Sequence, residues 1–179
     1  WLITPSRAAR RCKDLTTGKK QMNESTQNVM FSSKKQDWTT PQAFYERLDR
    51  MFGPFDLDPC SSQENAKCEN FFTKEDDGLG QDWDGHNVFA NPPYGREVAK
   101  WIKKGYDESR KDDTTVVLLV AARPDTKVWH EYIMKADEIY FVKGRLKFGE
   151  GKNSAPFPSA VVVFRNDRRQ QTIGTLERT

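Results

Sequence analysis

Four consecutive residues carry the most informative chemistry in this chain: Asn91, Pro92, Pro93 and Tyr94. They follow the apolar run 88–90, and a β-branched and aromatic run that stops at two prolines predicts a buried strand ending in a rigid loop. Because prolines fix φ and lack an N–H, the loop carbonyls stay free to accept hydrogen bonds. The Asn91 side-chain carbonyl, the Pro92 carbonyl and the Tyr94 ring would suit an aromatic amine, gripped at its edge and on its face. A plain strand-terminating turn is the alternative for the tetrapeptide alone.

Further motifs accompany the tetrapeptide in a fixed order. They are Trp38 to Gln42, Phe55 to Cys60, Glu64 to Cys68, Asp76 to Leu79, Asp82-Trp83 and Lys143 to Phe148. Asn-Pro-Pro-Tyr at a strand end resembles the catalytic loop of amino-methyltransferases that use S-adenosylmethionine. The ordered set, over about residues 30 to 165, resembles the phage-type DNA N-6-adenine methyltransferases.

The resemblance implies an enzyme that methylates the exocyclic N-6 amine of an adenine flipped out of DNA, with S-adenosylmethionine as the methyl donor. The catalytic residues would be Asn91, Pro92, Pro93 and Tyr94. Asn91 and the Pro92 carbonyl would accept the two amine protons, and Tyr94 would stack on the base. Two other readings stay open: a methyltransferase acting on RNA or on a protein glutamine, and a nucleic-acid-binding module without activity.

Cofactor residues also follow from the resemblance. Asp58 stands at a predicted strand end, where open parallel sheets bind ligands, and with Pro59 and Cys60 it matches the family's first cofactor motif. Trp38, Thr39 and Pro41 match the segment beside the methionine end of the cofactor. Asp82 matches a second acidic position, expected to meet the adenosine. The loop after Asp58 lacks the Gly-x-Gly of most methyltransferases, and this departure slightly favours the binding module.

DNA contacts are expected in the segment after residue 142. Lys143, Arg145 and Lys147 make this segment locally basic, whereas the net charge of the whole chain is only +3. DNA binding must therefore be local. A second aromatic ring, Phe148 or Phe157, is expected to close the far side of the flipped base, although either ring could equally be core packing.

The elements that position these residues alternate along the chain. The expected helices are residues 41–52, capped by Thr39 or Thr40, then 98–109 and 126–134; the expected strands are 55–58, 88–90, 114–121, 138–142 and 160–164. Alternating strands and helices predict an α/β sheet with right-handed crossovers. The resemblance implies a Rossmann-like methyltransferase fold, with a central, mostly parallel sheet flanked by helices.

Composition agrees with one domain. The chain has 179 residues, of which 36% are hydrophobic, enough for a single core of ordinary size. We expect a disordered leader at 1–29, the methyltransferase domain at 30–168 and a disordered tail at 169–179. Apolar runs are too short for a membrane span or a signal peptide, so we expect a cytoplasmic protein, a monomer, with DNA and no membrane as partner. Three cysteines at unpaired spacings predict no metal site.

Overall fold

The computed structural model describes residues 38–149, 154–166 and 170–178. Its centre is a seven-stranded sheet with the strand order β2-β1-β3-β4-β6-β5-β7. The strands are β1 (Leu57–Asp58), β2 (Asn70–Phe71), β3 (Asn87–Ala90), β4 (Thr115–Ala121), β5 (Glu138–Lys143), β6 (Ser159–Phe164) and β7 (Thr172–Glu177). The helices are α2 (Gln42–Phe52), α3 (Val98–Glu108), α4 (Lys127–Glu131) and the 3-10 turn η1 (Ile133–Lys135).

Strand directions confirm the predicted α/β class. Among the described strands, β6 alone runs against its neighbours, pairing antiparallel with both β4 and β5. The pairs β1–β2, β1–β3, β3–β4 and β5–β7 are parallel. The sheet is therefore mixed and mostly parallel, and helices flank it, as in a Rossmann-like methyltransferase fold.

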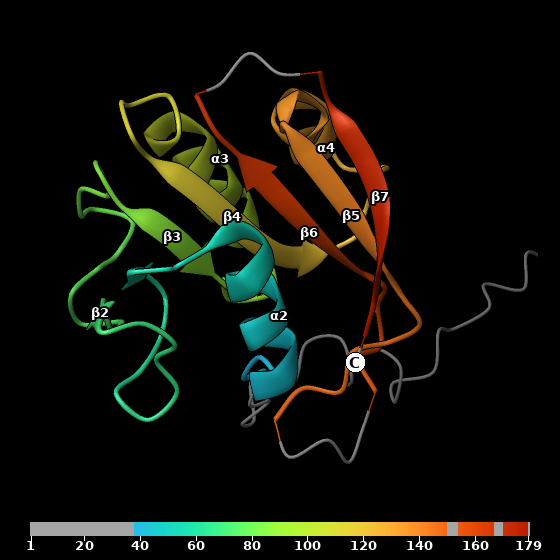
Figure 1. The fold of residues 1–179 in the computed structure, drawn as a ribbon, viewed down its shortest axis with the longest axis horizontal. Coiled ribbons are helices and arrows are strands. Elements are labelled where there is room, and N and C mark those ends of the chain that lie inside the picture. Colours follow the sequence, from blue (N-terminus) through green and yellow to red (C-terminus); the bar gives the residue numbers. More distant parts are fainter. Residues whose placement is uncertain (1–37, 150–153, 167–169, 179) are drawn as a thin grey trace, which may run out of the picture. The chain divides into compact units, whose positions relative to one another are not determined.

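Helices cover both faces of the sheet, with α2 on one side and α3 and α4 on the other (Figure 1). The alternation within β4 shows how this works. Val116, Leu118 and Val120 pack with α3 and α4, whereas Val117 and Leu119 pack with α2. A strand buried on both faces needs an unbroken apolar run, and for this reason the strand at residues 115–121 could be predicted from the sequence.

The order of the strands creates a switch point between β1 and β3. From β1 the chain passes to β2 on one side, then returns to β3 on the other side of β1. Loops that leave β1 and β3 at their carboxyl ends diverge there, and this is the place where open α/β sheets bind ligands. Asp58 ends β1, and Asn91 directly follows β3.

Three expectations about elements need correction. Neither Thr39 nor Thr40 caps α2: Pro41 is the N-cap residue, and no side chain bonds the first turn. The predicted helix 126–134 is shorter, because α4 ends at Glu131 and a 3-10 turn follows. The tail predicted to be disordered contains β7, whose residues 172–177 pair in register with 138–143.

The described residues all belong to one compact unit. The leader expected at residues 1–29 lies outside the described residues. None of the helices in the described part of the chain has the length and apolar content needed to cross a bilayer.

Candidate active site

The side-chain amide of Asn91 is held on both sides. Its Nδ2 donates to the main-chain carbonyl of Trp38 at 2.6 Å, and its Oδ1 accepts the hydroxyl of Tyr94 at 3.1 Å. A carbonyl can only accept, so the Trp38 contact fixes which end of the amide carries the nitrogen. The amide oxygen therefore faces Tyr94, and it keeps a second lone pair for another donor.

An aromatic cluster forms at the loop 91–94. It consists of Trp38, Tyr94, Phe148 and Phe157, and five of its six ring pairs have centroids between 4.6 and 6.0 Å apart. The closest pair is Tyr94 and Phe157, at 4.6 Å and 34°. Burial raises the pKa of the Tyr94 hydroxyl well above its usual range, so this group stays protonated and can donate.

The prolines of the loop differ in exposure. Pro92 is buried and Pro93 is exposed. Within the described main chain no N–H donates to the Pro92 carbonyl, as expected for a rigid loop that leaves an acceptor free. Gly95 follows with φ of 131°, a conformation that side-chain-bearing residues rarely adopt, and its missing Cβ would meet open space. The turn therefore requires a glycine for its backbone, and packing places no demand there.

Asp58 organises the loop that leaves β1. Its carboxylate accepts the main-chain N–H of Cys60 at 3.4 Å and that of Lys67 at 3.2 Å. The side chain is only 4% exposed, and burial raises its pKa to about 6, against the opposing effect of the two N–H donors and the Lys67 charge. Among the described residues it has no ion-pair partner, so a cation placed here would be favourable.

Two features that the sequence motifs did not predict lie beside Asp58. A Cβ on Gly78 would come within 1.9 Å of the Pro59 carbonyl oxygen, so the loops after β1 and β2 touch through their backbones. The hydroxyl of Ser61 is buried and has no hydrogen-bond partner among the described residues. Such an unsatisfied buried hydroxyl usually calls for a ligand or water. The sequence signal was Gly78 within the Asp-Asp-Gly-Leu motif, since glycine permits close backbone approach.

Cys60 lies where the loop after β1 meets the loop 91–94. Burial raises the pKa of its thiol well above the usual range, and the nearby main-chain N–H of Asn91 opposes the rise. The thiol is therefore a neutral packing group. The described residues contain no cluster of His, Cys, Asp or Glu side chains that could hold a metal ion.

The segment before α2 packs between the catalytic loop and the segment that precedes residue 150. Trp38 bonds Asn91, and the Thr39 carbonyl accepts the N–H of Gly149 at 3.0 Å. Pro41 begins α2, and its carbonyl accepts the N–H of Phe44 and of Tyr45, both at 3.0 Å. The structure thus brings Trp38, Thr39 and Pro41 to the same sheet edge as Asn91.

Asp82 is not brought to that edge. Its exposed carboxylate pairs with Lys111, just beyond the end of α3, and Lys111 also binds Glu108 at 2.8 Å. The bond from Lys111 is the main reason that the pKa of Asp82 falls to about 2. Since α3 starts at the carboxyl edge and runs back, its end lies at the amino edge, beside the start of β3. The structure therefore separates Asp82 from Asp58 and Asn91.

The predicted DNA-binding segment alternates in exposure. Arg145 and Lys147 are exposed, whereas Leu146 and Phe148 are buried. Lys143 is also exposed and pairs with Glu177 of β7 at 3.1 Å. Phe148 therefore packs inside the aromatic cluster, and the basic side chains next to it point outward.

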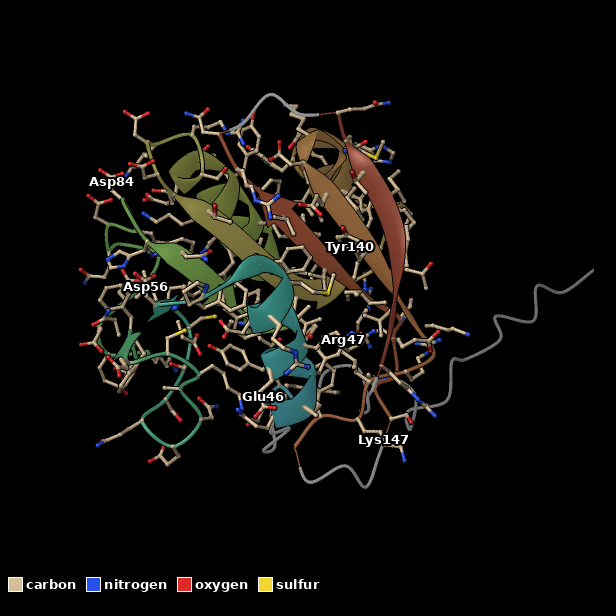
Figure 2. All side chains as sticks on the ribbon, viewed as in Figure 1. Glu46, Arg47, Asp56, Asp84, Tyr140 and Lys147 are labelled. Atoms are coloured by element: carbon tan, nitrogen blue, oxygen red, sulfur yellow. The ribbon has the colours of Figure 1, made fainter. Side chains whose placement is uncertain are left out.

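His86 has a carboxylate partner, although it stands alone in the sequence motifs. The structure pairs its Nδ1 with Asp56 at 3.1 Å. His86 directly precedes β3 and Asp56 directly precedes β1, so both lie at the edge opposite the loop 91–94, and Figure 2 shows Asp56 on that side of the sheet. The pair therefore belongs to the structure of the amino edge and takes no part in the site.

A comparison with family models gives a direct match. The model described as DNA N-6-adenine-methyltransferase (Dam) matches residues 27–177, which include every element above. The chain belongs to this family. Its reaction is the methylation of adenine in DNA at N-6, and the chain is accordingly an adenine-specific DNA methyltransferase.

Curated relatives agree with the family assignment. The chain is 31% identical over 143 residues to a DNA N-6-adenine-methyltransferase of Haemophilus phage HP1, covering 74% of this chain and 82% of that protein. It is 29% identical over 137 residues to the enzyme of the same name from Escherichia phage T1, covering 75% of this chain and 54% of the phage protein. A putative methyltransferase of Escherichia coli, YfdM, is 38% identical over 63 residues, which is 32% of this chain and 69% of that protein.

Proposed function

We propose that Asn91, Pro92, Pro93 and Tyr94 carry out the methyl transfer, with S-adenosylmethionine as donor and a flipped-out adenine of DNA as acceptor. The observation that supports this assignment is the orientation of the Asn91 amide. Trp38 holds its nitrogen, so its oxygen is directed at the loop where the amine would enter. An acceptor fixed in advance in this way costs no reorganisation during the reaction.

The residues at the end of β1 fit the proposed donor. S-adenosylmethionine carries a sulfonium cation and an amino acid group, and Asp58 is a buried carboxylate without an ion-pair partner among the described residues. The unpartnered Ser61 hydroxyl offers a polar contact, and the Gly78–Pro59 contact shapes the adjoining wall. Asp58, Pro59, Cys60 and Ser61 would hold the cofactor, with Trp38, Thr39 and Pro41 alongside. When bound, it supplies an electrophilic methyl group.

The catalytic loop would act on the amine through two acceptors. An exocyclic amine on adenine is a poor nucleophile because its lone pair is delocalised into the ring. If Asn91 Oδ1 and the Pro92 carbonyl accept its two protons, the nitrogen becomes more tetrahedral and its lone pair is localised. Positioning and charge stabilisation then account for the catalysis, and no covalent enzyme intermediate is needed.

The base must leave the duplex to reach this loop. We expect its face to stack on Tyr94, a contact that contributes about 1–3 kcal/mol. In the structure Phe157 already lies 4.6 Å from the Tyr94 ring. A base between the two rings needs about 3.4 Å on each side, the spacing of stacked bases in DNA. Phe157 must therefore shift outward by roughly 2 Å, or the base displaces it from Tyr94 altogether.

The test combines binding with product analysis. Wild-type protein should bind S-adenosylmethionine in titration calorimetry and transfer tritium from the labelled methyl group into DNA. Digestion of that DNA should yield N-6-methyl-2′-deoxyadenosine as the labelled nucleoside. Label in RNA or protein, with none in DNA, would contradict the proposal, and so would a labelled nucleoside other than N-6-methyl-2′-deoxyadenosine.

A further inference from the structure

Five basic side chains gather where β5 and β7 end. We call this set the β5–β7 basic patch: Arg47, Lys143, Arg145, Lys147 and Arg178. All except the half-buried Arg47 are exposed. The patch joins three parts of the sequence, α2, the segment after β5 and the end of β7, and Figure 2 shows Arg47 and Lys147 on the same half of the molecule.

Contacts through Glu177 hold the patch together. Arg47 donates from Nη1 to the Glu177 carbonyl at 3.0 Å, and Lys143 pairs with the Glu177 carboxylate at 3.1 Å. The Arg178 side chain lies across Gly144, since a Cβ there would be 3.5 Å from its Cδ. Among the patch's described contacts, Glu177 supplies the one carboxylate, so the patch carries a clear excess of positive charge.

The opposite corner of the unit is acidic. Exposed aspartates on the loops that lead into β1, β3 and β4 are Asp56, Asp82, Asp84, Asp112 and Asp113. Figure 2 shows Asp56 and Asp84 on the β1–β3 side, away from Lys147. A polyanion would therefore be attracted to one end of the sheet and repelled from the other.

We propose that the β5–β7 basic patch, including Arg47 and Arg178, binds the phosphate backbone of DNA on one side of the flipped adenine. The inference rests on the proposed function. The patch continues into Phe148, whose ring centroid is 6.0 Å from that of Tyr94. β5 lies three strand positions from β3, so Lys143 stands about 14 Å from the catalytic loop along the sheet, and β7 about 19 Å. At about 3.4 Å per base pair these distances place the contacted phosphates roughly four to six base pairs from the adenine.

The salt dependence of DNA binding tests the proposal. Each phosphate contact contributes about 0.9 to the slope of log affinity against log salt concentration. A double variant, Arg47→Gln with Arg178→Gln, removes two charges while keeping polar stems. On a 25-base-pair duplex pool of random sequence, it should lower the slope by about two and weaken binding several-fold at 0.1 M salt.

A charge-matched control separates local contacts from net charge. Lys103→Gln with Lys127→Gln removes two exposed cations from α3 and α4, each of them already paired with an acid, and the slope should stay within 0.5 of the wild-type value. A third variant, Glu177→Gln, removes the acid within the patch and should tighten binding. An unchanged slope in the arginine pair, or an equal loss in the control pair, would overturn the inference.

The failure of the inference is distinguishable from that of the proposed function. Methyl transfer into the same duplex pool is measured for the wild type at the start. If the wild type methylates DNA but the double variant of Arg47 and Arg178 keeps the wild-type salt dependence, the proposed DNA contact is wrong and the proposed function stands. If the wild type neither binds nor methylates the DNA, both are wrong. Thermal melting of each variant checks that folding is retained.

Discussion

Tyr94 takes part in both steps of the proposed mechanism, binding of the base and activation of its amine. Its hydroxyl donates to Asn91, and its ring packs against Phe157. Tyr94→Phe keeps the ring and frees the lone pair of Asn91 Oδ1 that the hydroxyl occupies, so turnover should remain within about tenfold of wild type, about 1.4 kcal/mol. Tyr94→Ala removes the stacking face and should lower kcat/KM by about 1–3 kcal/mol. Steady-state methyl transfer by both variants shows whether the ring or the hydroxyl of Tyr94 is needed for activity. If Tyr94→Phe were as inactive as Tyr94→Ala, the hydroxyl would be the essential group.

A second prediction at this scale concerns the pH dependence of Asp58. Its pKa is raised to about 6 by burial, and a cation binds the ionised form. Affinity for S-adenosylmethionine should therefore rise as the pH increases from 5 to 7, with a midpoint near 6, and Asp58→Asn should abolish that rise. Titration calorimetry at several pH values measures it. A pH-independent affinity in the wild type would remove Asp58 from the cofactor site.

The same shift has a consequence for folding. Because the folded state holds the Asp58 proton more tightly than the unfolded chain, this group stabilises the protein at low pH, and its contribution is lost as the pH rises from 3.8 to about 6. A bound cofactor would favour the ionised carboxylate and so restore this stability at neutral pH.

At the scale of elements, the contact between the loops after β1 and β2 leaves no space for a side chain at Gly78. Gly78→Ala would place a Cβ 1.9 Å from the Pro59 oxygen, so one loop must move. We expect a loss of about 1–3 kcal/mol in the free energy of unfolding, the usual cost of overpacking. Urea titration measures it. Unchanged stability of Gly78→Ala would contradict the packing argument.

β7 gives another prediction about elements. Leu176 is 3% exposed and packs on the α2 side of the core, whereas Ile173 on the same strand is 62% exposed. Leu176→Ala should cost about 2–5 kcal/mol, and Ile173→Ala should stay within about 0.5 kcal/mol of wild type. Thermal or urea unfolding compares the two. Equal, small effects would show that β7 is dispensable, as the sequence had suggested.

Elements with strong apolar patterns were predictable, and the others were not. The run 115–121 and the helix 42–52 follow from burial on one or two faces, which leaves a pattern in the residues. β7 is an edge strand of mostly exposed, polar residues, joined to β5 through main-chain hydrogen bonds. Main-chain pairing leaves no mark on side-chain hydrophobicity, so residues 172–177 looked like a tail.

At the scale of the whole molecule, the two proposed tasks, cofactor binding and DNA binding, belong to opposite ends of the sheet. The β1 end holds Asp58, the β5–β7 end holds the basic side chains, and Asn91 lies between them. Sequence motifs gave the catalytic loop and Asp58 their places at the carboxyl edge. The motifs misplaced Asp82: it stands shortly before β3, so it lies at the amino edge of the sheet, where it pairs with Lys111.

The most direct test of the account is single-turnover methyl transfer by Asn91→Ala, with S-adenosylmethionine affinity measured in the same preparation. If the Asn91 amide activates the amine, the variant should bind the cofactor with wild-type affinity and lose at least about a hundredfold in the rate of N-6-methyladenine formation in DNA, a difference of about 2.7 kcal/mol in the barrier. A variant that forms N-6-methyladenine in DNA at the wild-type rate would contradict the proposed mechanism.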